Sequence, residues 1–219
     1  MKKIYFPFFL VLSIASFLTL SSKKTYTYDE IVNNKNTSST WTVENKKQQL
    51  IIVGKSKKNT TTITTNQNYS FQKYQYISSD KKTNYTISKK NGALHCEGIV
   101  NGKKQRKTHN IGNTAWIQQF SFGLYPLASS SKKELRFYSV NPKDFSINKL
   151  IATKKGTENL YIKDKKYSSQ KMLITLPGFK GLFWEAYIWF NAKTHEFLKY
   201  KGDEGPNTPT TTILLHIKS

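Results

Sequence analysis

Apolar and polar residues alternate along most of the chain, which is the pattern of half-buried β-strands. Runs rich in β-branched and aromatic residues recur between turn residues, and together they indicate many short strands. The strands predicted are Thr25–Val32, Thr40–Val43, Gln48–Val53, Ile63–Thr65, Tyr69–Ile77, Asn84–Ser88, Ala93–Val100, Lys103–His109, Glu134–Val140, Phe145–Ala152, Glu158–Ile162, Ser168–Leu176, Trp184–Phe190, Glu196–Tyr200 and Thr211–Ile217. This spacing predicts a mainly β fold, built as a large curved antiparallel sheet or a half-closed β-barrel.

Two Asn-Gly pairs mark hairpins in the first half. Asn91-Gly92 and Asn101-Gly102 each separate two predicted strands, and both residues of such a pair tolerate the positive φ angles of a type I′ turn. The first half therefore reads as an antiparallel meander. In the second half, Lys154–Gly156 is expected to be another turn.

One segment departs from the two-residue period. Asn113–Ala128 places Trp116, Phe120 and Leu124 four residues apart, which is the spacing of one helix face. The pattern predicts one short helix of about ten residues that packs its aromatic face on the sheet, a length that is marginal without tertiary support.

The first residues have the layout of an export signal. Lys2 and Lys3 precede the uncharged run Ile4–Leu20, and the small residues Ser21 and Ser22 follow. Cleavage after Ser21 would leave a mature domain outside the cytoplasm, whereas an uncleaved N-terminus would tether that domain to the membrane. We therefore expect residues 1–21 to be a signal peptide or an N-terminal anchor, and residues 22–219 to form a single β-rich domain.

Charge is the most unusual feature of the composition, since 35 Lys and Arg residues face 13 Asp and Glu residues. This excess favours anionic partners. The lysines are nevertheless spread in pairs beside turn residues, and solvated loops and protected sheet edges explain this distribution better than a dedicated anion site does.

The side chains of catalysis and metal binding do not form a familiar pattern. His95, His109, His195 and His216 fit no metal-ligand spacing, and the sequence contains no nucleophile elbow or phosphate loop. The single cysteine, Cys96, excludes an internal disulfide and is expected to be a buried, inert thiol. We therefore predict no enzyme activity, no cofactor and no metal.

Large aromatic residues crowd into two segments and are the candidate ligand-lining residues. They are Trp116, Phe120, Phe122, Phe183, Trp184 and Trp189. Such rings are most often core, but on a concave sheet they would also line a site for an apolar ligand. Along Trp184–Phe190, alternation assigns Ala186 and Phe190 to one face, and Tyr187 and Trp189 to the other, so both faces need cover.

The C-terminal half resembles a family of exported bacterial proteins of unknown function, the DUF3108-like proteins. The resemblance rests on the segments Glu134–Asp144, Ile174–Gly202 and Gly205–Leu215, and on the motif positions Trp184, Trp189, Phe190, Tyr200, Gly202, Gly205, Pro206, Pro209 and Thr210. It implies a curved sheet like that of the periplasmic lipoprotein carriers LolA and LolB, with an apolar concave face. It implies no enzyme and supplies no functional residues.

These observations predict a monomeric, non-enzymatic protein of the periplasm or cell envelope that binds a lipid or another amphiphile on the concave face of its sheet. The alternative is a structural or interaction module that binds an anionic envelope polymer or the membrane surface through its basic face. Nucleic acid is not expected as a partner. The segment Tyr69–Lys82 does interleave basic and aromatic residues, but an exported location argues against that role.

Overall fold

The computed structural model describes residues 23–203 and 209–216. The expected signal peptide or anchor lies outside the described residues, and so do the motif positions Gly205 and Pro206. Within the described ranges, no helix has the length and apolar character needed to cross a bilayer.

The prediction of a mainly β protein is confirmed. The strands are β1 (Lys23–Val32), β2 (Lys35–Lys46), β3 (Gln49–Ser56), β4 (Asn59–Asn66), β5 (Phe71–Ser78), β6 (Asn84–Lys90), β7 (Ala93–Val100), β8 (Lys103–Asn110), β9 (Ala115–Trp116), β10 (Glu134–Val140), β11 (Ile147–Ile162), β12 (Lys165–Thr175), β13 (Glu185–Asn191), β14 (Phe197–Asp203) and β15 (Thr210–Leu215). The helical elements are α1 (Phe120–Gly123), α2 (Tyr125–Ala128) and the 3₁₀ turn η1 (Gly178–Leu182).

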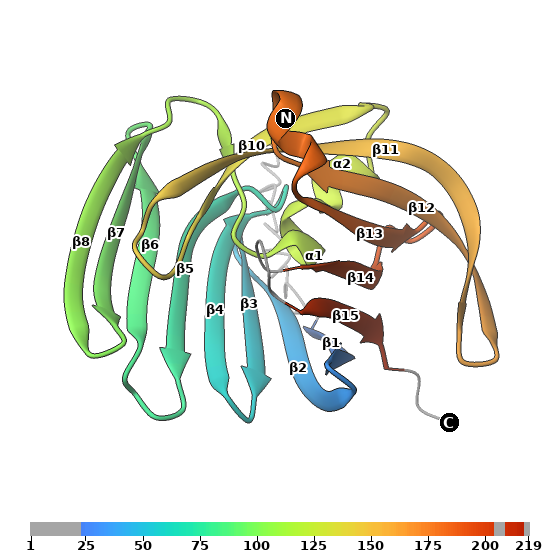
Figure 1. Ribbon diagram of the computed structural model, residues 1–219, viewed down its shortest axis with the longest axis horizontal. Helices are drawn as coiled ribbons and strands as arrows, with labels where there is room; N and C mark the ends of the chain where they lie inside the picture. Colours follow the sequence, from blue (N-terminus) through green and yellow to red (C-terminus); the bar gives the residue numbers. More distant parts are fainter. Residues whose placement is uncertain (1–22, 204–208, 217–219) are drawn as a thin grey trace, which may run out of the picture.

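All of these strands belong to one strongly curved sheet (Figure 1). Its order is β8-β7-β6-β5-β4-β3-β2-β1-β15-β14-β13-β12-β11-β10-β9, so it consists of two meanders joined where β1 pairs with β15. Neighbouring strands are antiparallel, and only β9 runs parallel to its partner β10. The sheet does not close, because in the described chain its two edge strands, β8 and β9, are not paired with each other.

Both Asn-Gly turns are confirmed. Asn91 and Gly92 have φ angles of 51° and 75°, and Asn101 and Gly102 have φ angles of 50° and 78°. Two consecutive positive φ angles define the type I′ geometry, whose twist matches that of the flanking strands. The turns set the register of β6, β7 and β8, in which Ile87 faces Cys96 and Cys96 faces Lys107.

The predicted ten-residue helix is wrong in its extent. Ala115 and Trp116 form β9 beside β10, and the helical residues that follow divide into α1 and α2 at Leu124, whose φ and ψ are −93° and 0°. The edge of β10 provides hydrogen-bond partners that a marginal helix lacks, and Ile117 N–H donates to the Tyr138 carbonyl at 2.9 Å. Pro126 lies in the first turn of α2, where its missing N–H is not needed.

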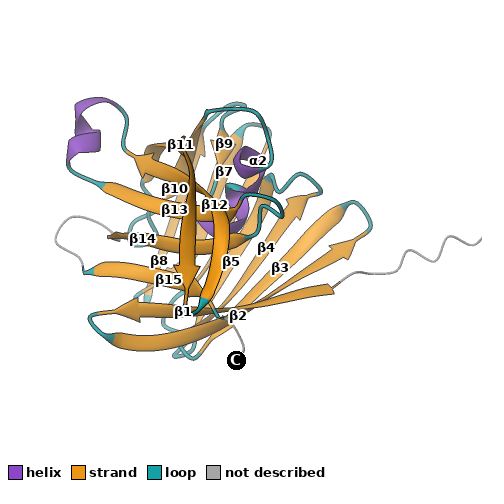
Figure 2. Cartoon of the chain, turned by 90° about the vertical axis from the view of Figure 1, so that its right-hand side faces the viewer, coloured by secondary structure: helices purple, strands orange, loops and turns teal. Residues whose placement is uncertain are grey.

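The short helices lie inside the curve of the sheet and divide its interior (Figures 1 and 2). One core is built on β2–β7 and includes Ile52, Ile63 and Ile87, and Phe122 of α1 packs into it. The other core is built on β10–β14 and includes Leu124 and Leu127. Apolar side chains on the inner face of both meanders are therefore buried against the helices.

The expected turn at Lys154–Gly156 is also wrong. β11 continues through these residues, and the register with β12 shifts between Lys154 and Gly156. Gly156 has a φ of 123°, which L side chains rarely adopt, so the glycine makes a β-bulge instead of a chain reversal. The bulge bends the long β11–β12 hairpin.

Candidate functional site

The structure does not bring the six predicted ligand-lining aromatics together. Trp116 and Phe122 are buried in the first core, whereas Phe120 and Trp184 pack at the edge of the second core. Trp189 belongs to a third, smaller cluster. The remaining candidate, Phe183, is 75% exposed beside η1 and therefore lines no interior surface.

Trp189 shows how the second face of β13 is covered. The alternation predicted for this strand is present, because Ala186, Ile188 and Phe190 are in the second core, while Trp189 packs on the opposite side with Leu160 and Leu198. The indole N–H of Trp189 donates to Glu158 Oε1 at 2.6 Å. The bent β11–β12 hairpin thus supplies the cover that the second face of β13 needs.

The other motif positions have structural roles. Phe190 is fully buried and Tyr200 is half-buried in the second core, while Pro209 is exposed. Trp184 donates from its indole N–H to the Asp203 carbonyl at 2.9 Å, which ties the start of β13 to the end of β14. Gly202 lies against Ala186, where a side chain at position 202 would clash with the Ala186 methyl group.

A different set of residues lines a hollow on the inner side of the first meander. We call it the tyrosine groove, and it has a volume of about 590 Å³, within the range of small-molecule sites. It lies on the inner side of β5–β7, beneath the connection between β10 and β11. Its lining residues are Tyr74, Tyr76, Ser78, Asp80, Lys82, Thr83, Tyr85, Val100, Asn101, Gln118, Pro142 and Lys143.

Stacked phenol rings form the wall of the tyrosine groove. Tyr76 and Tyr85 are direct cross-strand partners on β5 and β6, and their ring centroids lie 5.3 Å apart. Tyr74 lies two residues before Tyr76 on the same face and stacks on Tyr85 at 6.1 Å. Gly98 makes room for this wall, since a Cβ there would approach Tyr85 Cα to 2.5 Å. Tyr74 and Tyr85 are only 6% and 4% exposed and Tyr76 is half-buried, so Tyr76 supplies most of the aromatic surface that a ligand in the groove would contact.

Tyr74 and Tyr85 stay protonated at neutral pH. Burial raises the pKa of Tyr74 from 10.0 to about 12, although hydrogen bonds to Thr61 and Tyr85 oppose the shift. Burial likewise raises the pKa of Tyr85 well above its ordinary value. These two buried rings are therefore neutral and weakly polar, and they bring no charge into the interior.

The charged residues of the lining are all exposed, and we call the side of the groove where they stand its mouth. Asp80 and Lys82 lie on the β5–β6 turn, and Lys143 lies on the β10–β11 turn. The Asp80 carboxylate accepts from Ser78 Oγ at 2.6 Å and from the Lys82 backbone N–H at 3.0 Å, and these hydrogen bonds lower the pKa of Asp80. An apolar wall with polar groups gathered at the mouth matches a molecule with one apolar and one polar end.

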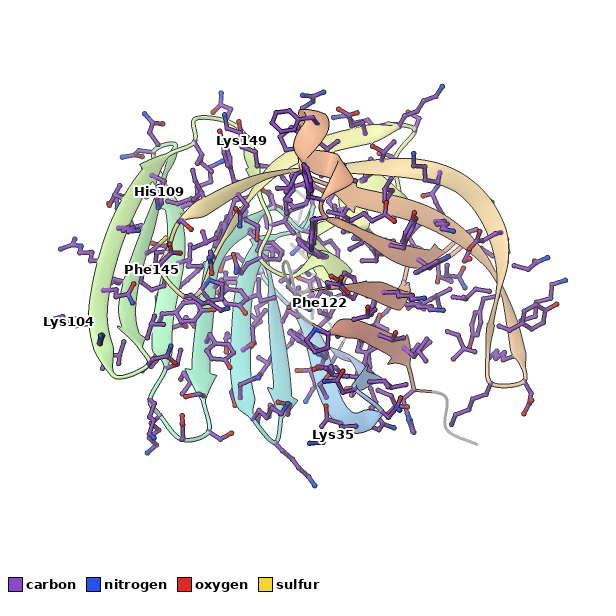
Figure 3. The ribbon with its side chains drawn as sticks, viewed as in Figure 1. Lys35, Lys104, His109, Phe122, Phe145 and Lys149 are labelled. Atoms are coloured by element: carbon purple, nitrogen blue, oxygen red, sulfur yellow. The ribbon has the colours of Figure 1, made fainter. Side chains whose placement is uncertain are left out.

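The turn between β10 and β11 covers the groove from the other side. His109 Nε2–H of β8 donates to the Phe145 carbonyl at 2.6 Å, and Gln105 Nε2 of the same strand donates to the Lys143 carbonyl at 3.3 Å. The Phe145 side chain is fully buried and meets the Tyr85 ring edge-on at 5.6 Å. Figure 3 shows His109 and Phe145 on the same side of the molecule, where this turn crosses towards β8.

A second cavity of about 60 Å³ is too small for an amphiphile and is rich in polar groups. Tyr26 donates from its hydroxyl to Glu196 Oε1 at 3.1 Å, and Lys24 Nζ lies 3.7 Å from the same oxygen. Burial, together with Glu196, raises the pKa of Tyr26. These polar groups satisfy one another, which indicates a structural role.

The comparisons with known proteins concern the fold. No family model matches this chain, and the search of curated proteins finds no match. Among solved structures, a β-barrel-like protein of the domain of unknown function DUF1849 from Brucella abortus aligns with a TM-score of 0.57 at 8% identity, over 90% of this chain and 96% of that chain. This alignment supports a barrel-like fold of the kind expected, and the DUF3108 resemblance stays a prediction.

Two further structures align with lower scores. The hypothetical lipoprotein YmcC from Escherichia coli has a TM-score of 0.44 at 12% identity, over 89% of this chain and 87% of that chain. The LolA superfamily protein NE2245 from Nitrosomonas europaea has a TM-score of 0.24 at 8% identity, over 90% of this chain and 84% of that chain. We draw no argument from these two alignments.

Sequence reasoning missed the tyrosine groove because it favoured the bulkiest rings. A usable signal was present in the first half, where Tyr74 and Tyr76 alternate along one predicted strand and Tyr85 lies near the start of the next. The opposite wall had no such signal. Gln118, Pro142 and Lys143 reach the groove only through the crossing of the β10–β11 turn.

Proposed function

We propose that this protein is a non-enzymatic binding protein that holds the apolar part of a lipid or another amphiphile in the tyrosine groove. The observation that carries the proposal is the groove itself, about 590 Å³ in volume, with neutral stacked tyrosines as its wall and charged groups only at its mouth. A location outside the cytoplasm follows from the signal-like sequence of residues 1–21 and belongs to the same proposal.

The groove is tested by titrating the protein with a fluorescent long-chain fatty acid. We expect saturable binding, because a ring wall and a volume in this range bury much of such a ligand. Mass spectrometry of an organic extract of the purified protein provides an independent readout of any lipid that has stayed bound.

Tyr76→Ala is the informative variant. Tyr76 is half-buried and forms part of the wall, so its truncation removes ring contacts with the ligand and is expected to weaken fatty-acid binding about tenfold. Ile77→Ala is the matched control, because Ile77 is the next residue of β5, points to the outer face and is 42% exposed. Unsaturable uptake, or equal affinities for the two variants, would contradict the proposal.

A further inference from the structure

Three hairpin turns at one end of the first meander each carry or adjoin a pair of lysines. The β3–β4 turn carries Lys57 and Lys58, the β5–β6 turn carries Lys81 and Lys82, and Lys103 and Lys104 follow the Asn101-Gly102 turn. We call these residues the lysine rim. All of them are exposed, and Asp80 is the one acidic residue within these turns.

Hydrogen bonds join the three turns into one surface. Ser79 N–H donates to the Lys58 carbonyl at 2.8 Å, and Ser79 Oγ donates to the Lys57 carbonyl at 2.7 Å. On the other side of the β5–β6 turn, Gly102 N–H donates to the Lys82 carbonyl at 2.9 Å. Asn101 N–H also donates to Thr83 Oγ1 at 3.2 Å. The backbone that carries the lysines is therefore held in a fixed arrangement, so a flat anionic surface meets several ammonium groups together.

The lysine rim borders the mouth of the tyrosine groove. Ser78, Asp80, Lys82, Thr83 and Asn101 line the groove and lie in or next to the same turns. In Figure 1 these turns form the lower edge of the sheet, and in Figure 3 Lys104 and Lys35 are labelled along that edge. Any surface bound by the rim therefore faces the open end of the groove.

We propose that the lysine rim docks the protein on an anionic lipid bilayer with the groove mouth towards the lipid headgroups. This inference rests on the proposed function, because a bilayer is the anionic surface that also supplies an amphiphile to the groove. A nucleic acid fits less well, since the three turns contain no aromatic residue on which a base could stack. Clustered lysines attract anionic headgroups at close range, and the attraction falls as salt screens it.

The test compares two variants with the same loss of charge. The rim variant replaces Lys57, Lys58, Lys103 and Lys104 by Gln and leaves the groove lining intact. The control variant replaces Lys46, Lys47, Lys90 and Lys193 by Gln, all exposed residues in or beside the β2–β3, β6–β7 and β13–β14 turns. Both variants retain residues 1–22, so any contribution of that segment is common to both.

Binding is measured by co-sedimentation with vesicles of phosphatidylcholine containing about one third phosphatidylglycerol, a fraction chosen to give a negative surface. We expect the unmodified protein and the control variant to bind these vesicles at low salt. We expect the rim variant to bind these vesicles at least about 30-fold more weakly. With vesicles of pure phosphatidylcholine, we expect no salt-dependent binding by the unmodified protein or by either variant. Circular dichroism confirms that both variants are folded.

The outcomes separate the two proposals. The rim proposal is overturned if the two variants bind the anionic vesicles equally. It is also overturned if the protein binds the anionic polymer dextran sulfate through the rim but does not bind the anionic vesicles. If the unmodified protein does not bind the fatty acid but its vesicle binding still depends on the rim, the proposed lipid binding in the groove is overturned and the proposed membrane docking is not. Rim-dependent vesicle binding with fatty-acid affinity unchanged in the rim variant supports both.

Discussion

Gly54 shows how a single residue shapes the inner face of the sheet. It is the cross-strand partner of Trp41, and a Cβ at position 54 would lie 2.6 Å from three atoms of the Trp41 ring. The ring packs over the bare backbone of Gly54 and reaches Phe122 of α1, with centroids 5.2 Å apart. The absence of one side chain therefore lets the indole connect the sheet to the helices inside it.

Gly54→Ala is expected to lower the free energy of unfolding by about 1–3 kcal/mol, because the new methyl group displaces the Trp41 ring from Gly54 and from Phe122. Urea denaturation measures the change. Thr62→Ala on the outer face of β4 serves as the surface control, and a Gly54 variant as stable as this control would show that the ring is free to move.

Cys96 behaves as the sequence predicted, as a buried thiol. Its side chain is fully buried, and burial raises the pKa of the thiol from 9.0 to about 11, despite the nearby Lys107. Since the thiolate is the reactive form, we expect native protein at pH 8 to resist an aromatic disulfide reagent, and urea-unfolded protein to react promptly. Rapid labelling of the native protein would place the thiol at the surface.

At the scale of elements, the β10–β11 turn links the second meander to β6 and β8 of the first. Phe145 has a φ of 55°, which is unusual for a bulky residue, and its burial against Tyr85 holds it there. The sequence placed Phe145 at the start of a strand because it is aromatic and precedes apolar residues. Only the contact with β6 and β8, which are distant in sequence, explains its position in a turn.

His109→Ala removes the donor to the Phe145 carbonyl and is expected to lower the free energy of unfolding by about 1 kcal/mol. It should also raise the amide hydrogen-exchange rates of Asn141 and Phe145, whose N–H groups bond within the turn. Thr108→Ala is the control, because Thr108 is exposed on the other face of β8. Exchange rates that are the same in both variants would show that the turn does not depend on His109.

The failed helix prediction has a related cause. Trp116, Phe120 and Leu124 are correctly spaced for one helix face, and all three do contribute to the interior. The side-chain amide of Gln118 nevertheless pairs with the Val140 backbone, donating to its carbonyl at 2.8 Å and accepting from its N–H at 3.0 Å. This segment therefore extends along the β10 edge, a partner that local periodicity does not reveal.

At the scale of the whole molecule, the buried phenols and the thiol make stability depend on alkaline pH. The pKa of Cys96 is raised to about 11 and that of Tyr74 to about 12, and burial also raises the pKa of Tyr28 and Tyr85. The folded chain thus keeps protons that the unfolded chain loses near pH 9–10, so stability falls as pH rises through this window and beyond.

We therefore expect the urea midpoint to be insensitive to these groups below about pH 9 and to decrease steadily above it. Absorbance of tyrosinate should show the exposed phenols titrating first, and the buried ones ionising only as the chain unfolds. If all tyrosines ionised while the circular dichroism spectrum stayed that of the folded protein, the burial of these phenols would be contradicted.

The sequence by itself determined most of the strands, the two Asn-Gly hairpins, the mainly β class and the buried position of the cysteine. Alternation and turn chemistry are local, and they act over a few residues whatever the rest of the chain does. The tertiary structure decided the bulge at Gly156, the extended segment at Trp116 and the tyrosine groove itself. Each depends on which strands meet across the curved sheet, and such long-range pairing leaves no periodic trace in the residues that take part.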